Sequence, residues 1–211
     1  MGASEDWYEW HRPYDEPGSP LAARLAVVQR HITDWLDSRP GELLTCVSAC
    51  AGQGRDLIGV LERRDDARRV RARLLETDPR NVAVAEAHIA RAGLTGVEVL
   101  RADAGDLASY AGAIPADLLL FAGVLGNVTD ADARTSVTAF RSLCATRGTV
   151  IWTRTRQPPD LTPAVRGWLA DEGFEELTFE APPNATFSVG VHRLTVPPRP
   201  LTVGRMFTFV R

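Results

Sequence analysis

The run of residues from 116 to 122 constrains the fold of this chain more than any other segment. It reads ADLLLFA, so a single acidic residue precedes an uninterrupted apolar stretch. A strand without a polar face has no side to offer water, and such strands are typical of parallel sheets that helices cover on both faces. Parallel strands need long crossover connections, which are usually helical. The run therefore predicts an α/β sheet in which strands and helices alternate along the chain.

Further strand and helix patterns alternate on both sides of this run. Apolar, β-rich patterns occur at 43–49, 70–76, 97–101, 149–153, 175–180 and 205–210. Helical spacing of apolar residues occurs at 20–39, around 57–61, and at 81–93, 130–145 and 164–172. The segment between the last two strand patterns has no helical period, which predicts an antiparallel pair at the C-terminus. We expect a Rossmann-like, doubly wound, mostly parallel seven-stranded sheet with a C-terminal antiparallel hairpin, built as one domain from residues 1–211.

Composition and charge narrow the classes of function. The formal net charge is -3 and the sequence has no basic tract, which is unfavourable for binding a nucleic-acid backbone. No apolar run approaches the roughly 20 residues that span a bilayer, and the N-terminus lacks the apolar block of a secretory signal. The cysteines Cys46, Cys50 and Cys144 lack metal-ligand spacing. We therefore expect a cytoplasmic protein that acts on a small molecule, without a metal, a nucleic-acid partner or a membrane anchor.

Glycine and acidic residues lie where three of the predicted strands end. Gly52 and Gly54 follow the first strand, Glu76 ends the second, and Asp103 follows the third. In an open parallel sheet, ligands bind beyond the carboxyl ends of the strands. Glycines let the backbone approach a ligand, and an acidic side chain about 20 residues further on can accept both hydroxyls of a ribose. Because Asp103 can accept a hydrogen bond from the amino group of adenine, the three strand ends together predict an adenosine site.

Each of these features also has a purely structural interpretation. The glycine pair can serve as a tight turn between a strand and a helix. Either acidic residue can be a solvated loop residue or a cap on the next helix. Independent surface residues have no reason to fall at successive strand ends, so the combined pattern favours the binding site.

Four stretches at these strand ends resemble motifs of class I S-adenosylmethionine (SAM)-dependent methyltransferases. VSACAGQGRD is similar to the glycine-rich first motif, LLETDP to the acidic second-strand motif, RADAGD to the adenine-contacting motif, and PADLLLFAGVLGN to the fourth strand and its following loop. The resemblance covers residues 43–153. WHRPYD, WTRTRQPPD and FSVGVHRL also resemble segments of a bacterial group named methyltransferases by similarity. The resemblance implies SAM as the cofactor, contacted by Ser48, Cys50, Ala51, Gly52, Gly54, Glu76, Thr77, Asp103, Ala104 and Gly123.

The sequence departs from the family's pattern at two positions of the first motif. Ser48 stands where the family usually has an acidic residue, and Cys50 stands where it has its first glycine. Both positions contact the methionine half of the cofactor in the family. The resemblance therefore supports binding of the adenosyl half better than binding of the methionine half. After the fourth strand, GVLGN replaces the Asp/Asn-Pro-Pro-aromatic motif of amino-group and adenine methyltransferases. This replacement disfavours methylation of a nucleobase.

The resemblance implies a methyltransferase that acts on a small molecule. The departures leave two alternatives open. One is an enzyme that uses SAM without transferring methyl, by alkyl transfer, lyase or cyclisation chemistry, and the other is a non-catalytic SAM-binding protein. A nicotinamide oxidoreductase is disfavoured, because its fingerprint needs a third glycine where Leu57 stands.

The chemistry of methyl transfer indicates which side chains to consider. Displacement at a sulfonium depends on alignment and on the exclusion of water. A base near a hydroxyl acceptor adds a factor of about 10²–10⁴. The candidates for this base are His11, in an aromatic N-terminal segment, and His192, between the last two predicted strands. Tyr14, Asn127 and Arg154 are the candidates for contacting the acceptor.

The aromatic N-terminal segment has two interpretations. Trp7, Trp10 and Tyr14 precede the first helix with no apolar period of their own. They can pack on the sheet edge as a hydrophobic strap. Alternatively, residues 1–18 form a lid that closes over the cofactor and the acceptor.

Overall fold

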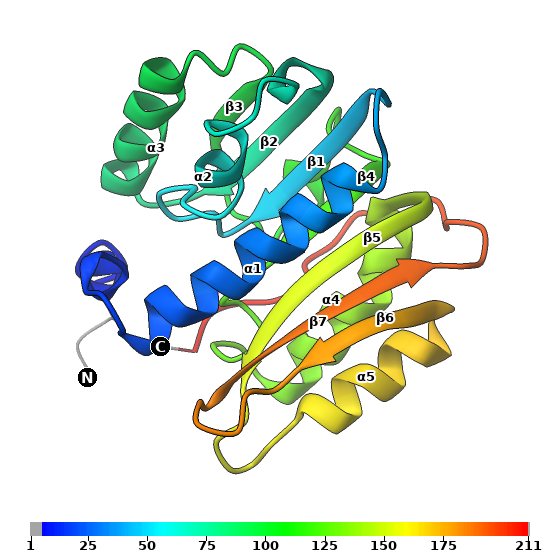
Figure 1. Ribbon diagram of the computed structural model, residues 1–211. Helices are drawn as coiled ribbons and strands as arrows, with labels where there is room; N and C mark the ends of the chain where they lie inside the picture. The colour runs from blue at the N-terminus through cyan, green and yellow to red at the C-terminus, as the bar shows by residue number, and fades with distance from the viewer. Residues whose placement is uncertain (1–5, 211) are drawn as a thin grey trace.

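Strand β4 (Ala116–Phe121), which carries the apolar run, lies in the middle of a seven-stranded sheet. Figure 1 shows the computed structural model, which describes residues 6–210. Leu119 and Phe121 belong to one hydrophobic cluster of the protein, and Leu118 and Leu120 belong to another. The strand is thus buried on both faces, as its sequence predicts. Residues 1–5 of the predicted lid, and residue 211, lie outside the described residues.

The sheet has the strand order β3-β2-β1-β4-β5-β7-β6. The other strands are β1 (Leu44–Ala49), β2 (Val70–Glu76), β3 (Val97–Arg101), β5 (Cys144–Thr155), β6 (Phe174–Glu180) and β7 (Phe187–Leu194). Strands β1 to β5 pair in parallel, and β7 runs antiparallel to both β5 and β6. The mostly parallel, doubly wound α/β sheet is confirmed. The order reverses between β1 and β4, which is where a sheet of this kind opens a ligand crevice.

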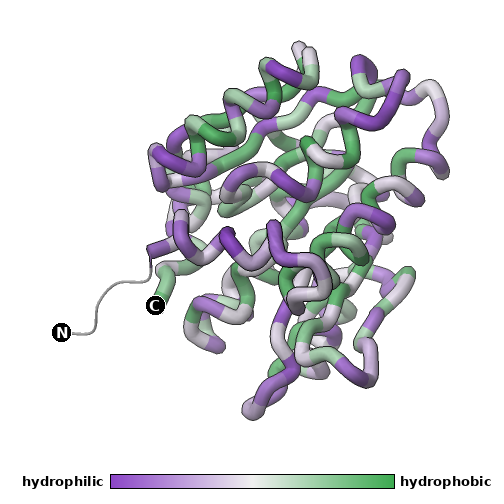
Figure 2. Tube along the Cα trace, turned by 60° about the vertical axis from the view of Figure 1, so that its left-hand side comes forward, coloured by the Kyte–Doolittle hydropathy of each residue, from purple (hydrophilic) through white to green (hydrophobic). Residues whose placement is uncertain are grey.

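Two layers of helices cover the sheet (Figure 1). The described residues form α1 (Pro20–Asp37), α2 (Leu57–Leu61) and α3 (Pro79–Ala92) over one face, and α4 (Asp130–Leu143) and α5 (Thr162–Asp171) over the other. The Ser19 hydroxyl accepts a hydrogen bond from the Ala22 N–H at 3.0 Å, and Pro20 takes the first helical position, so α1 begins where the sequence predicts. Hydrophobic and hydrophilic residues alternate along the helices (Figure 2). None of these helices is long and apolar enough to cross a membrane.

The C-terminal hairpin is present, but the prediction that its second strand lies at 205–210 is wrong. The second strand is β7, which reads FSVGVHRL and is buried between β5 and β6. Gly190 breaks its apolar pattern because the residue lies against Trp152, where a Cβ would collide with the indole. Residues 205–210 cross the loop after β3, where Arg205 forms an isolated bridge with Asp106. The apolar side chains of this segment pack beside the sheet, and this packing explains their β-like spacing in the sequence.

Candidate functional site

A cavity of about 300 Å³ lies beyond the carboxyl ends of β1 to β4, where the strand order reverses. Helix α1 and residues from two distant segments, 7–14 and 205–209, complete its wall. The expected site residues that line it are His11, Tyr14, Cys50, Ala51, Glu76, Thr77, Asp103, Ala104 and Gly123. The expected site residues outside this lining are Ser48, Gly52, Gly54, Asn127, Arg154 and His192.

The loop after β1 turns through three residues with positive φ. The φ angle is 51° at Cys50, 56° at Gly52 and 69° at Gly54. A Cβ on Gly54 would collide with Ile58 of α2, and a Cβ on Gly52 would collide with the imidazole of His11. Both glycines are therefore required by packing within the protein as well as by conformation. Burial raises the pKa of the Cys50 thiol, so the thiol stays protonated at neutral pH.

Glu76 holds in place the loop after β1 that contains Gly52 and Gly54, which we call the glycine loop. Its side chain is buried, and one carboxylate oxygen accepts a hydrogen bond from the Gly52 N–H at 2.8 Å. The other oxygen accepts from the N–H groups of Thr77 at 3.0 Å and Asp78 at 2.8 Å. A carboxylate offers about four lone-pair sites. The arrangement therefore leaves the oxygen facing Gly52 with room for one further donor, such as a ligand hydroxyl.

Asp103 connects the loop after β3 to the C-terminal segment. Its Oδ1 accepts a hydrogen bond from the Gly105 N–H at 2.8 Å, and its Oδ2 forms an ion pair with Arg205 at 2.8 Å. The Met206 N–H donates to the Gly105 carbonyl at 2.7 Å, which fixes the same segment. The sequence indicates Asp103 through its place at a strand end. Nothing local indicates Arg205, because its partner lies about half the chain away.

Asn81 is a cavity residue that the sequence analysis does not identify. It lies in the first turn of α3, is fully buried, and accepts a hydrogen bond from the Gln53 amide at 3.4 Å. Its Nδ2 has no hydrogen-bond partner among the described residues. Buried polar groups are nearly always paired, so this unpaired donor beside the cavity is a candidate contact for an oxygen atom of a ligand or a buried water. The signal available in the sequence was a polar residue in the first helical turn after the acidic strand end.

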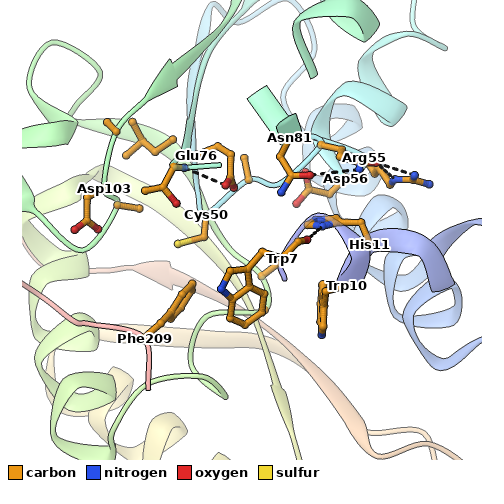
Figure 3. Close-up of a pocket in the computed structure, with 18 of the residues that line it drawn as sticks. Trp7, Trp10, His11, Cys50, Arg55, Asp56, Glu76, Asn81, Asp103 and Phe209 are labelled. Atoms are coloured by element: carbon orange, nitrogen blue, oxygen red, sulfur yellow. Dashed lines mark hydrogen bonds between the residues drawn. The ribbon is translucent and has the colours of Figure 1, made fainter. Parts of the chain in front are cut away.

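His11 lies directly on the glycine loop (Figure 3). Its Nδ1 is 2.5 Å from the Trp7 carbonyl oxygen. A carbonyl only accepts hydrogen bonds, so Nδ1 carries the proton, and in the neutral ring Nε2 keeps a free lone pair. Burial lowers the pKa of His11, which favours this neutral form at physiological pH. The cavity wall thus contains a neutral imidazole in a fixed tautomer.

The N-terminal and C-terminal segments meet over the cavity. The ring centroids of Trp7 and Phe209 are 5.2 Å apart, and Figure 3 shows both rings below Cys50. Two ion pairs hold the N-terminal segment: Asp6 with Arg80 at 2.7 Å, and Asp15 with Arg55 at 2.5 Å. In this arrangement the aromatic side chains of Trp7, Trp10 and Tyr14 form part of the cavity wall.

Three of the expected residues are engaged elsewhere. His192 lies on β7 and not on a loop; it is buried, and its Nδ1 accepts a hydrogen bond from the Trp152 indole N–H at 3.2 Å. Asn127 donates to the Gly123 carbonyl at 2.7 Å, and Arg154 donates to the Leu125 carbonyl. The two side chains brace the loop after β4 from outside the cavity. Among the expected acceptor contacts, the structure brings only Tyr14 to the cavity wall.

No protein-family model matches this sequence. No curated protein resembles it in sequence at a significant level. Within the described part of the chain, no group of three or more His, Cys, Asp or Glu side chains is arranged to hold a metal ion. The comparison with solved structures is therefore the one that relates this chain to known proteins.

Several solved structures superpose on most of this chain. The magnesium protoporphyrin IX methyltransferase ChlM from Synechocystis PCC 6803, solved with bound SAM, has a TM-score of 0.69 over 92% of this chain and 100% of its own, at 15% identity. The CurJ carbon methyltransferase has a TM-score of 0.69 over 90% of this chain and 59% of its own, at 14% identity. The [4+2]-cyclase SpnF has a TM-score of 0.60 over 80% of this chain and 82% of its own, at 12% identity. With the strand order and the reversed hairpin, these superpositions show that the chain has the fold of class I SAM-dependent methyltransferases.

Proposed function

We propose that the cavity binds SAM and that the protein transfers its methyl group to a small molecule. The observation that carries this proposal is the meeting of the Glu76 carboxylate and the unpaired Asn81 amide on one cavity wall. A ribose offers hydroxyl donors to Glu76 and oxygen acceptors to Asn81, so the wall fits a nucleoside. Asp103, further along the same wall, suits the exocyclic amino group of adenine. Solved methyltransferases of the same fold support this ligand, and one of them contains SAM.

His11 is the side chain best arranged to accept a proton from an acceptor. When bound, SAM supplies an activated methyl group on a sulfonium centre. The Trp7 carbonyl fixes the tautomer that leaves Nε2 unprotonated, beside Gly52, and burial keeps the ring neutral. A hydroxyl acceptor that donates a hydrogen bond to Nε2 becomes a better nucleophile. Trp7 and Phe209 exclude water from the same region, which favours displacement at the sulfonium.

The lining of the cavity supports a small-molecule acceptor. The cavity has a volume of about 300 Å³ and includes the aromatic side chains of Trp7, Trp10, Phe207 and Phe209 in its wall. Small-molecule sites are typically apolar clefts of this kind with a few placed polar groups. The acceptor therefore enters beside these rings.

In a second candidate function, the protein uses SAM without transferring its methyl group, or binds SAM without reaction. The observation that favours it is the replacement of two family residues, by Ser48 within β1 and by the left-handed Cys50 after it. One protein of the same fold is a [4+2]-cyclase. Product analysis separates the possibilities. S-adenosylhomocysteine (SAH) indicates methyl transfer, methylthioadenosine indicates cleavage of a different carbon–sulfur bond, and an unchanged cofactor with acceptor turnover indicates a scaffold role.

Calorimetry with the full chain tests the cofactor assignment. SAM and SAH are titrated against the protein in parallel with NAD and NADP. We expect binding of the two sulfur-containing ligands and no comparable binding of the nicotinamide cofactors. Binding of a nicotinamide cofactor alone would overturn the proposal.

A further inference from the structure

Arg24 is a charged residue in the cavity wall that the proposed roles above do not use. It lies in the second turn of α1, and its side chain is half-buried. Its Cζ lies 5.6 Å from the centre of the Trp10 ring. Figure 3 places Trp10 and His11 on one side of Cys50 and Asp103 on the other. Arg24 therefore stands at the end of the cavity opposite the proposed adenine contact.

The Arg24 guanidinium has no carboxylate partner among residues 6–210. Arg24 Nη2 donates a hydrogen bond to the Tyr14 hydroxyl oxygen at 2.6 Å. The other arginines of the wall are paired, Arg55 with Asp15 and Arg205 with Asp103. A half-buried guanidinium loses hydration that an anionic partner would normally replace.

The second acid near this part of the cavity wall does not form an ion pair with Arg24. Asp56 lines the same wall, but no ion pair joins it to Arg24. Its Oδ1 accepts a hydrogen bond from the Leu57 N–H at 2.7 Å, at the start of α2. Burial raises the pKa of Asp56, and the charge of Arg24 acts against this shift without forming an ion pair.

We propose that Arg24 and Tyr14 bind a carboxylate group of a ligand. The guanidinium presents a planar fork of N–H donors that matches the two oxygens of a carboxylate. Because the Tyr14 oxygen accepts from Arg24, its own O–H proton is free to donate to the same anion. The absent Cβ of Gly123 leaves space beside Nη2, since a Cβ there would lie 3.7 Å from that nitrogen. The site therefore combines charge, a second donor and room for the ligand.

This inference rests on the proposed SAM site, and two ligands could supply the carboxylate. The first is SAM itself, whose amino-acid portion lies at the opposite end of the molecule from adenine. The second is an acceptor molecule that carries a carboxylate. Both sources share the same chemistry at Arg24, and different probes distinguish them.

The first experiment measures calorimetric affinities for SAH and for 5′-methylthioadenosine, which lacks the amino-acid portion. In Arg24→Gln we expect SAH to bind about 10–100-fold more weakly, the usual worth of a hydrogen bond to a charged group, while methylthioadenosine binds unchanged. Tyr14→Phe should show a smaller loss in the same direction. Arg30→Gln is the matched control, because Arg30 lies on the same helix but pairs with Glu180 on the surface. Thermal unfolding of each variant verifies the fold.

The second experiment tests the acceptor as the source of the carboxylate. Benzoate and benzamide are titrated in the presence of saturating SAH. A preference of wild type for benzoate that disappears in Arg24→Gln supports the inference with the acceptor as the source. If Arg24→Gln changes neither the SAH-to-methylthioadenosine ratio nor the benzoate-to-benzamide ratio, the inference is overturned. If wild type binds neither adenosyl ligand, the SAM proposal fails, and the benzoate pair, titrated without SAH, still decides the role of Arg24.

Discussion

The indole of Trp7 and the phenyl ring of Phe209 lie 5.2 Å apart, so the two ends of the described chain touch each other at the wall of the cavity. Neither segment belongs to the sheet. The Trp7 side is held by η1 (Glu9–Asp15) and the Asp15 ion pair, and the Phe209 side by the bridge between Arg205 and Asp106. A ligand that fills the cavity is therefore enclosed by structure that local opening can release without disturbing the core.

Replacing Trp7 by alanine tests the enclosing role of the N-terminal segment. The change removes an aromatic contact worth about 0.5–1.5 kcal/mol, so we expect SAH to dissociate up to about tenfold faster with little change in association. Stopped-flow measurement of ligand dissociation provides the readout. Trp168→Ala is the control, because Trp168 lies on α5 and packs against Arg134 outside the cavity. Equal dissociation rates in wild type and Trp7→Ala would contradict the lid.

Hydrogen exchange tests the same segment without a substitution. Amides of residues 6–15 should exchange more slowly when SAH is bound, because the segment closes over the ligand. Unchanged exchange, together with a large loss of stability on deleting residues 1–14, would show that the segment is a structural strap.

Glu76→Gln tests the proposed ribose contact. An amide keeps the size of the side chain but replaces one acceptor oxygen by a donor. It therefore cannot accept from the Thr77 and Asp78 N–H groups on one side and from the Gly52 N–H and a ribose hydroxyl on the other. We expect calorimetric affinity for SAH and for methylthioadenosine to fall by about 1.5–3 kcal/mol. Glu98→Gln, on the exposed side of β3, is the matched control. Full affinity in a folded Glu76→Gln protein would remove the ribose role and leave Glu76 as a loop anchor.

Asn81→Leu separates ligand binding from stability. The unpaired Nδ2 of Asn81 costs free energy in the ligand-free protein, and leucine has the same number of side-chain heavy atoms without that donor. Because leucine also removes the acceptor of the Gln53 amide, we expect the free energy of unfolding to change little. Binding of methylthioadenosine should weaken at the same time, because the donor is lost. Urea unfolding and calorimetry on one preparation measure both quantities. A variant that is less stable yet binds normally would show that Asn81 is a structural residue.

A double-mutant cycle between Gly52 and His11 measures the contact of the N-terminal segment with the loop. Gly52→Ala places a methyl group against the imidazole and imposes the strain of a positive φ, a cost of about 1–2 kcal/mol for the backbone alone. In a His11→Ala background the collision disappears and only the backbone strain remains. We expect the unfolding penalty of Gly52→Ala to be at least about 0.5 kcal/mol smaller there. Additive penalties would show that the two residues do not touch in solution.

The pH dependence of stability should report the burial of His192. Desolvation lowers the pKa of His192 to about 4, from an ordinary value near 6.5; Glu176 opposes this shift and Arg166 adds to it. Between these two pH values the unfolded chain binds a proton that the native protein does not, so stability falls as pH falls through that window. The loss amounts to at most about 3 kcal/mol. In His192→Gln the slope of the unfolding free energy between pH 6.5 and pH 4 should become shallower. An unchanged slope in His192→Gln would contradict this account.

The parallel part of the sheet is predictable because its determinants are local. The continuous apolar run of β4 indicates burial on both faces, and Ser19 and Pro20 mark the start of α1. The position of the last strand is not predictable in the same way. Gly190 weakens the β pattern of β7, and the reason for that glycine is the indole of Trp152 on another strand.

The part of the cavity wall that the strand ends form is predictable from the sequence, whereas the rest of the wall is not. Glu76 and Asp103 lie on it because the carboxyl ends of parallel strands meet at one edge of the sheet. Arg24 and Arg205 reach it through the placement of a helix and a tail, and no local pattern encodes this placement. His192 shows the converse error, since it is predicted on a loop between the last two strands but lies buried in the interior of β7.

The insertion of β7 between β5 and β6 has a consequence for synthesis on the ribosome. The pairing edges of β5 and β6 cannot be joined until β7 has left the exit tunnel, because it is the strand that joins them. Until then the nascent chain exposes two strand edges that are prone to pair with other chains. Helix α1 precedes the strands in the sequence and also packs against β7, so the packing of α1 on the sheet cannot be completed until β7 has been synthesised. Folding of this sheet consequently waits for the synthesis of β7, and refolding from denaturant should be slow relative to that of domains dominated by local contacts.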